Sequence, residues 1–222
     1  RNRAFYEYMV PIVKGYSTET AVEVASLGIQ VHGGMGFIEE TGAAQYYRDA
    51  RILPIYEGTT AIQANDLVSR KTQRDGGATA YAAIAAMRET LRAVEAESTR
   101  AAAPERDALR LLRDNLDGAI QAYEAGVGFI LEQSAANIRA VYSSSVPYLM
   151  LAGVVHGGWQ MARAVLACRR HIAAGSTDPF HKSKIATGLF YAAHILPRAL
   201  ALSAAVRAGV VADACGAASD IA

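Results

Sequence analysis

Cysteine and histidine are scarce in this sequence, and neither is spaced as metal ligands usually are. Cys168 and Cys215 lie far apart, and the five histidines include no HExxH motif. Zinc sites take clustered Cys and His ligands at short, fixed spacings. We therefore predict no metal site and expect both cysteines to be reduced thiols, buried or half-buried.

The chain also has no large excess of positive or negative charge. The 22 basic and 21 acidic residues are spread along the chain and leave a net charge of +1. Nucleic-acid-binding domains carry a basic patch or stripe, so we expect no nucleic-acid partner. Charged residues, Gly or Pro interrupt every apolar stretch before the roughly 20 residues that a membrane-spanning helix needs. We expect no membrane span and a cytoplasmic location.

Aromatic residues make up only 8% of the chain, and runs typical of strands are few. Hydrophobic residues reach 52%, with alanine dominating. Alanine has the highest helix propensity of the amino acids, so the composition predicts an all-α fold. A chain of 222 residues can form one large domain or two small ones.

Proline, glycine and threonine predict the element boundaries of the first region. Pro11 is compatible with a first helical turn, and the glycines at 33–36 can end the helix that it opens. Thr41 and Thr59 are candidate N-caps, and Pro54 stops the helix before it. The predicted helices cover about 11–32, 42–52 and 60–70.

The polar, glycine-containing stretch 72–77 is the predicted linker. It divides the chain into domains 1–75 and 76–222. Four long helices are expected after it, at about 78–99, 104–136, 145–174 and 181–209, and short connections favour an antiparallel bundle. Residues 1–6 read like the end of an element, and residue 1 is not Met. We therefore expect a fragment of a longer chain.

Three sequence blocks follow one another in the first region. The stretch Gln30–Gln63 reads QVHGGMGFIEETGAAQYYRDARILPIYEGTTAIQ. It resembles the carboxyl-terminal signature of the acyl-CoA dehydrogenase family, which is Gln-x-x-Gly-Gly-x-Gly, then Arg-Asp-Ala-Arg/Lys, then Ile-Tyr-Glu-Gly-Thr. The stretches 147–150, 157–159 and 196–198 are similar to the extra helical domain of a longer subclass, which includes enzymes acting on thioether acyl-CoAs such as 3-methylmercaptopropionyl-CoA.

The resemblance implies FAD-dependent α,β-dehydrogenation of an acyl-CoA thioester, with Glu57 as the base that removes the α-proton. A carboxylate becomes a stronger base in a dry pocket, because desolvation raises its pKa. By the same resemblance the Glu57 N–H polarises the thioester carbonyl, and Tyr56, Glu57 and Gly58 form the substrate-binding residues. The alternative interpretation is an acidic residue that stabilises a helix N-terminus.

The resemblance also implies a cofactor-binding set. Gln30, Gly33 and Gly34 match positions that contact FAD, usually the FAD of the neighbouring subunit, and Thr59 matches a flavin-contacting threonine. Backbone N–H groups without side chains can approach phosphate closely. The alternatives are an ordinary helix C-cap at the glycines and an N-cap at Thr59. Ala61 cannot make a contact that glutamine makes in several relatives.

The expected partners are an acyl-CoA, an electron-transfer flavoprotein and a second copy of the chain in a homodimer or higher homo-oligomer. The family's amino-terminal helical domain and β-domain, which supply most flavin and CoA contacts, are absent. We therefore expect the chain alone to be inactive and not to retain FAD. For Arg48, Asp49 and Arg51, an ion-pair network that fixes the turn before Glu57 is favoured over a phosphate clamp. The rival function is a non-catalytic helical assembly or dimerisation module.

Overall fold

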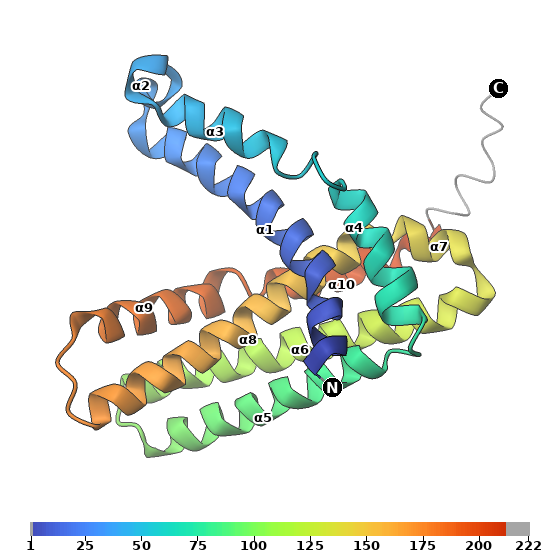
Figure 1. The fold of residues 1–222 in the computed structure, drawn as a ribbon. Coiled ribbons are helices and arrows are strands. Elements are labelled where there is room, and N and C mark those ends of the chain that lie inside the picture. Colours follow the sequence, from blue (N-terminus) through green and yellow to red (C-terminus); the bar gives the residue numbers. More distant parts are fainter. Residues whose placement is uncertain (1, 212–222) are drawn as a thin grey trace.

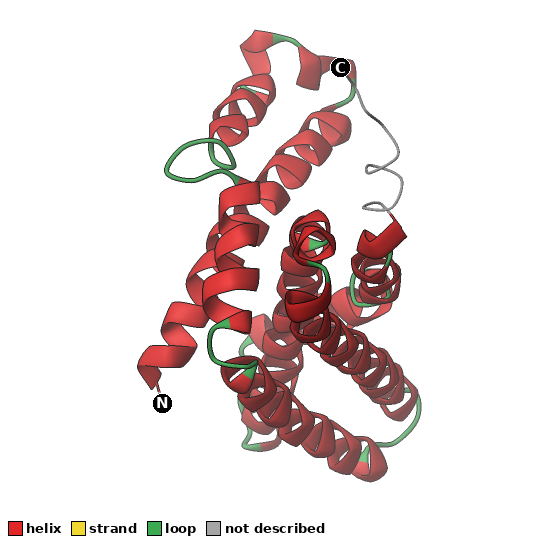
Figure 2. Ribbon diagram, turned by 90° about the vertical axis from the view of Figure 1, so that its right-hand side faces the viewer, coloured by secondary structure: helices red, strands yellow, loops and turns green. Residues whose placement is uncertain are grey.

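The computed structural model describes residues 2–211, which form helices and loops without any strand (Figure 2). The predicted all-α fold is therefore confirmed. Cys168 is a buried free thiol, as expected, whereas Cys215 lies outside the described residues.

The chain forms a bundle from which an arm projects (Figure 1). The bundle contains α5, α6, α8 and α9; we use "the arm" for residues 19–52, which comprise the end of α1 together with α2 and α3. In chain order the helical elements are α1 (Asn2–His32), α2 (Gly34–Phe37), the 3-10 helix η1 (Glu39–Thr41), α3 (Ala43–Ile52), α4 (Thr60–Asp66), the π-helix η2 (Leu67–Gln73), α5 (Ala78–Arg100), α6 (Glu105–Ala136), α7 (Ile138–Ser143), α8 (Ser145–Ala173), α9 (Pro179–His194) and α10 (Arg198–Arg207).

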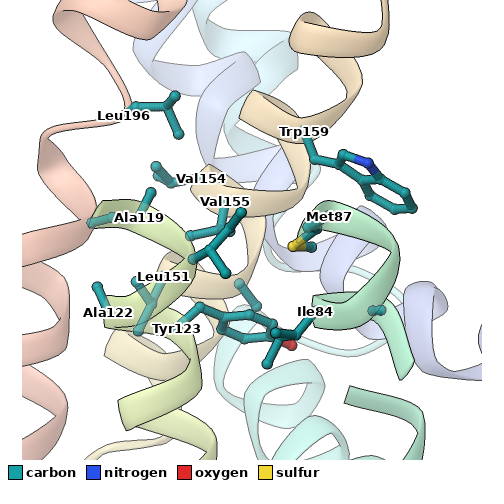
Figure 3. Close-up of a cluster of buried hydrophobic side chains, with 14 of the residues drawn as sticks. Ile84, Met87, Ala119, Ala122, Tyr123, Leu151, Val154, Val155, Trp159 and Leu196 are labelled. Carbon is teal, nitrogen blue, oxygen red and sulfur yellow. The ribbon is translucent and has the colours of Figure 1, made fainter. Parts of the chain in front are cut away.

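Helix α6 shows why this sequence forms a bundle. Its buried apolar residues recur at steps of three and four, the spacing that places side chains on one helix face. Several of these residues meet α5 and α8 in one apolar cluster (Figure 3). Each fully buried aliphatic side chain contributes roughly 1.5–3 kcal/mol. The buried positions are Leu109, Leu112, Leu116, Ala119, Ile120, Ala122, Tyr123, Gly126, Val127 and Ile130.

Helix α1 is longer than the sequence predicted. It begins at Asn2 and passes through Pro11, so residues 2–6 do not end a separate element. Phe5 packs edge-on against Trp159 of α8, with ring centroids 6.3 Å apart. Pro11 is buried, and this packing holds a proline inside a helix despite the missing N–H. Tertiary contacts outweigh the local preference here.

The two threonine caps differ in outcome. Thr59 caps α4 as predicted, because its hydroxyl accepts from the Ile62 N–H at 3.4 Å. Thr41 does not cap α3. Its hydroxyl donates to the carbonyls of Met35 and Ile38, and Gly42 takes the N-cap position with φ 77°. The prediction at Thr41 is wrong because its hydroxyl closes the preceding turn instead.

The predicted linker 72–77 is packed rather than free. Thr72 is fully buried, and its hydroxyl lies 3.1 Å from the Tyr148 hydroxyl. Asp75 accepts from the N–H groups of Gly77 and Thr79 at 3.0 Å, which starts α5. The stretch is therefore a tight turn between η2 and α5.

The fourth long helix that the sequence predicted, 181–209, is two helices. Helix α9 ends at His194 and α10 begins at Arg198. Pro197 lies between them, and its missing N–H and its ring prevent the helix from continuing. Short α7 also separates α6 from α8. Four predicted helices therefore become six, within the part of the chain that the structure describes.

The two predicted regions share one continuous core. Tyr8 of α1 hydrogen-bonds to Tyr123 of α6 and lies 3.4 Å from the Tyr148 hydroxyl of α8. All three rings are buried, and burial raises the pKa of Tyr123 and of Tyr148. We call these three residues the tyrosine cluster. The domain boundary at 75/76 stays a prediction.

Helices α1 and α8 cross at glycines. Gly15 lies against Leu149, which is 2.7 Å from where a Cβ would be, and a Cβ on Gly153 would overlap the Tyr16 ring. Overpacking a helix contact costs about 1–3 kcal/mol, whereas Gly to Ala in an open helical site gains about 0.5–1 kcal/mol.

We therefore expect Gly153→Ala to lower the free energy of unfolding by about 1–3 kcal/mol. The control is Gly128→Ala in α6, where an added Cβ meets no atom within 4 Å, and which should stabilise slightly. Urea denaturation of the 222-residue chain measures both. A neutral or stabilising Gly153→Ala would contradict the close crossing.

Among the described residues no single helix is both long enough and apolar enough to cross a membrane. The helices Pro179–His194 and Arg198–Val211, which are bent by 41° relative to each other, have the length and apolar composition of a membrane span only when they are taken together.

Candidate functional site

Glu57 lies in an unusual backbone conformation. Residues 53–59, here called the Glu57 loop, connect α3 to α4. Glu57 has φ 51°, the one non-glycine residue with positive φ in the described chain, and Gly58 follows with φ 95°. A non-glycine residue in the left-handed region is strained, and such strain clusters at functional sites. This observation favours a functional role for Glu57.

Lys14 of α1 hydrogen-bonds to the backbone of the Glu57 loop. Its Nζ donates to the carbonyl oxygens of Leu53 at 3.0 Å, Tyr56 at 3.0 Å and Gly58 at 2.6 Å. The same Nζ lies 5.7 Å from the centroid of the Tyr56 ring. One ammonium group therefore contacts the backbone on both sides of Glu57.

The end of the loop is tied to α1 a second time. The Thr60 hydroxyl donates to Glu19 Oε1 at 2.5 Å, and the Thr60 N–H donates to the Pro54 carbonyl at 3.2 Å. At Gly58, a Cβ would lie 2.8 Å from Gln63 Nε2 as well as in a left-handed conformation. The loop has one well-defined shape, and Gly58 is the residue that this shape accommodates.

The Glu57 carboxylate is free to interact with a ligand. It is exposed, and within residues 2–211 neither its side chain nor its N–H has a hydrogen-bond or ion-pair partner. A helix-stabilising role would leave the strained backbone unexplained. The dry pocket expected around this carboxylate is not formed by the described residues.

The cofactor candidates Gln30, Gly33 and Gly34 lie at the other end of the arm. Helix α3 separates them from the Glu57 loop (Figure 1), and ten helical residues span about 15 Å. The structure therefore brings Tyr56, Glu57, Gly58 and Thr59 together in one loop and places the Gln30–Gly34 segment elsewhere.

The Gln30–Gly34 segment is open to a ligand. Gly33 has φ 62°, its N–H donates to the Gln30 carbonyl at 3.1 Å, and α2 starts at Gly34. A Cβ on Gly33 or Gly34 would meet no atom of this chain within 4 Å. The backbone there is exposed, so a phosphate-bearing group could approach it closely. These residues fit the pyrophosphate of a dinucleotide cofactor.

Two family models match this chain. One, described as acyl-CoA dehydrogenase, C-terminal domain, covers residues 3–72, and the other, described as acetyl-CoA dehydrogenase C-terminal like, covers residues 78–213. The second match alone spans more than half of the chain. The chain belongs to the acyl-CoA dehydrogenase family.

Similar proteins within the family are much longer than this chain. It is 50% identical to 3-methylmercaptopropionyl-CoA dehydrogenase of Ruegeria pomeroyi over 190 residues, which are 86% of this chain and 31% of the relative. It is 32% identical to the broad-specificity linear acyl-CoA dehydrogenase FadE5 of Mycobacterium tuberculosis, with the same two shares. The chain thus spans about a third of the length of these relatives.

One further match covers a shorter stretch of the chain. The caffeyl-CoA reductase-Etf complex subunit CarC of Acetobacterium woodii is 40% identical over 52 residues, which are 23% of this chain and 14% of that protein.

The charged residues of α3 do not act as predicted. Arg48 pairs with Glu39 at 3.3 Å and donates to Gln45, which in turn donates to Asp49. Arg51 makes no ion pair among residues 2–211. The network ties α3 to η1 and does not reach the Glu57 loop, so the prediction that it fixes this loop is wrong. Exposed ion pairs of this kind contribute little to the free energy of folding.

Sequence reasoning missed Lys14, the residue whose ammonium group binds the Glu57 loop. It lies in the middle of α1, far from the Ile-Tyr-Glu-Gly-Thr block in sequence, and no local motif marks it. Only the antiparallel packing of α1 against α3 and α4 brings it behind the Glu57 loop.

Other sites are weaker candidates. Among residues 2–211 no group of three or more His, Cys, Asp or Glu could hold a metal ion. A largely apolar cavity of about 550 Å³ lies between the C-terminal ends of α5 and α8, the start of α6 and one side of α9. It contains none of the family-signature residues, so it is not the site that these residues form.

Proposed function

We propose that this chain is the base-bearing, carboxyl-terminal part of an acyl-CoA dehydrogenase that performs FAD-dependent α,β-dehydrogenation of an acyl-CoA thioester. The observation that carries the proposal is Glu57, an uncommitted carboxylate in a strained backbone conformation on a loop that α1 holds in place. The test is α-proton abstraction by a Glu57→Gln variant of the full-length enzyme.

In the proposed reaction the Glu57 carboxylate takes the proton from the carbon next to the thioester carbonyl. The Glu57 N–H, free of partners in the described chain, donates to the carbonyl oxygen, where negative charge develops. Tyr56 and Gly58 flank this position and bound the space that the thioester enters. A bound FAD would supply the acceptor for the hydride that leaves the β-carbon.

The pocket must be completed by residues beyond this chain. Glu57 is exposed here, and a working base gains strength when water is excluded. The relatives' additional length supports the proposal that other domains close over Glu57. The same reasoning leads us to propose that residues 1–222 alone neither retain FAD nor turn over substrate.

The Gln30–Gly34 segment is proposed to hold the pyrophosphate part of FAD bound mainly by a neighbouring subunit. The resemblance carries this assignment, and α3 separates the segment from the Glu57 loop of the same chain. Thr59, whose hydroxyl caps α4, is proposed to contact flavin as well. Electrons are proposed to leave through an electron-transfer flavoprotein; the match to a subunit of an Etf complex supports this.

A second candidate function, a non-catalytic assembly or dimerisation module, draws on the apolar surface of the arm. Leu27 is 56% exposed, Val31 85% and Phe37 80%. Exposed apolar patches of this kind mark interaction surfaces. The two functions are compatible, because an arm that reaches a neighbouring subunit must also bind to it.

We expect the 222-residue chain to form a homodimer, the commonest closed assembly, with the arm in the interface. Leu27→Asp should then shift the chain to monomer, since an interface cannot bury an unpaired carboxylate cheaply. Sedimentation equilibrium over a wide concentration range measures this. The matched control is Leu111→Asp on α6, where the leucine is 43% exposed. If the unsubstituted chain is a monomer, the proposed dimer is wrong. If the Leu27→Asp variant is still a dimer, the interface lies in the bundle and not in the arm.

A further inference from the structure

Lys14 uses its whole hydrogen-bonding capacity on the Glu57 loop. A lysine ammonium has three N–H donors and no acceptor, and three loop carbonyls lie 2.6–3.0 Å from Nζ. We infer that Lys14 is a positioning residue, which sets the backbone conformation from which Glu57 reaches the substrate. The inference rests on the proposed role of Glu57 as the base.

The geometry explains how one side chain can fix another residue's backbone. Tyr56 and Gly58 are the immediate neighbours of Glu57, and Lys14 binds both of their carbonyls. The Tyr56 carbonyl belongs to the peptide plane that precedes Glu57, and the Gly58 carbonyl belongs to the plane that follows Gly58, so the planes on either side of the Glu57–Gly58 pair are anchored to the same atom. With both flanking planes anchored, Glu57 and Gly58 can change their backbone angles only in concert, which restricts the conformation of Glu57.

Strain at Glu57 makes such an anchor necessary. Residues held in the left-handed region persist only where the surroundings over-determine them. Glu57 contributes no contact of its own, because its side chain and N–H have no partner within residues 2–211. Among the described residues, Lys14 supplies the side-chain hydrogen bonds to the loop on both sides of Glu57.

An ordinary structural role for Lys14 would look different. Leu53 is the C-cap residue of α3, and a lysine often stabilises the last carbonyls of a helix. That role accounts for the contact with Leu53 and leaves the contacts with Tyr56 and Gly58 unexplained. Lys14 is half-buried, and charge-assisted hydrogen bonds are strong and directional, so its three bonds fix position as well as stability.

Lys14 remains outside the reaction itself. All three of its donors are occupied by the loop, which leaves none for the thioester or the flavin. Its effect on the rate must pass through Glu57. A change at Lys14 is therefore expected to alter the rate constant of proton abstraction more than the affinity for substrate.

The test is a double-mutant cycle between Lys14→Met and Glu57→Gln in the full-length enzyme, read as single-turnover flavin reduction by an acyl-CoA. We expect Lys14→Met to slow flavin reduction about 100-fold, the effect of misplacing a reacting group by roughly 1 Å, with flavin content and KM little changed. In the Glu57→Gln background the same exchange should cause little further loss, because the two residues act as a unit.

Two further variants separate positioning from folding. Lys184→Met replaces another half-buried lysine, on α9, and should leave the rate unchanged. Lys14→Arg keeps the charge and the fold, but a planar fork cannot direct its donors at three convergent carbonyls; we expect an intermediate loss of rate at an unchanged melting temperature.

The outcomes distinguish the two proposals. A normal rate in Glu57→Gln overturns the proposed function itself. A severe loss in Glu57→Gln with normal rates in Lys14→Met and Lys14→Arg overturns only the inference about Lys14. A Lys14→Met loss that persists in full in the Glu57→Gln background also overturns it, since Lys14 would then act independently of the base.

Discussion

Replacing Glu57 with Gln in the full-length enzyme is expected to lower the rate of dehydrogenation by a factor of about 100 to 10,000, the usual effect of losing a general base. Gln keeps the size of the side chain and cannot accept the α-proton. The backbone of the loop should persist, because the three carbonyls bound by Lys14 are unaffected. Flavin reduction and exchange of the substrate α-proton with deuterated solvent measure the step directly.

The control for this exchange is Glu132→Gln. Glu132 is an exposed glutamate of α6 without an ion pair among the described residues, so its replacement should leave the rate unchanged. Both variants should contain the normal amount of flavin. Near-normal α-proton exchange in Glu57→Gln would remove Glu57 from the reaction, and loss of flavin would point to a structural role instead.

The free energy of unfolding is expected to fall as pH is lowered from about 6.5 to about 4, because of His156. This side chain is buried among the rings of Tyr8, Tyr123 and Trp159, and its Nε2 has no hydrogen-bond partner among residues 2–211. Burial lowers the pKa of His156 to about 4, while the hydrogen bond of its Nδ1 to the Ala152 carbonyl partly opposes this.

The direction follows from proton binding in the two states. Between its folded pKa of about 4 and its unfolded value of 6.5, His156 binds a proton only in the unfolded chain. Acidification therefore favours unfolding, and the stability present above pH 6.5 is lost progressively down to pH 4. A difference of this size corresponds to about 3 kcal/mol.

The measurement is urea denaturation of the 222-residue chain at several pH values. His156→Leu replaces the titrating ring with an apolar group and should remove about 3 kcal/mol of pH dependence relative to the parent. His194→Leu is the matched control, because His194 is exposed on α9, and it should retain the dependence. Equal pH dependence in all three chains would show that His156 is not the titrating group.

Much of this fold was predictable because its signals are local. The steps of three and four along α6 indicate a helix with one buried face, and Thr59 followed by a helical stretch indicates an N-cap. Glu57 and its neighbours were predicted from a motif that is contiguous in sequence. Each of these features depends on residues close together in the chain.

Most features that sequence reasoning missed depend on contacts between residues that are far apart in the sequence. Pro11 inside α1 is buried, and no local pattern reveals that burial. Pro197 did carry a local signal, and the break that it causes was missed because the apolar pattern continues across it. The contacts of Lys14 depend on the packing of α1 beside the Glu57 loop, which is distant from it in sequence.

The tyrosine cluster joins α1, which carries Lys14, to α6 and α8 through one shared core. Because α1 packs into this core, unfolding of the bundle would also displace Lys14 and the Glu57 loop that it binds. In genetic terms, a destabilising allele far from Glu57, for instance in the middle of α6, would behave as a temperature-sensitive loss of the enzyme. The phenotype of such an allele would be indistinguishable from that of an active-site lesion at the restrictive temperature and silent at the permissive one.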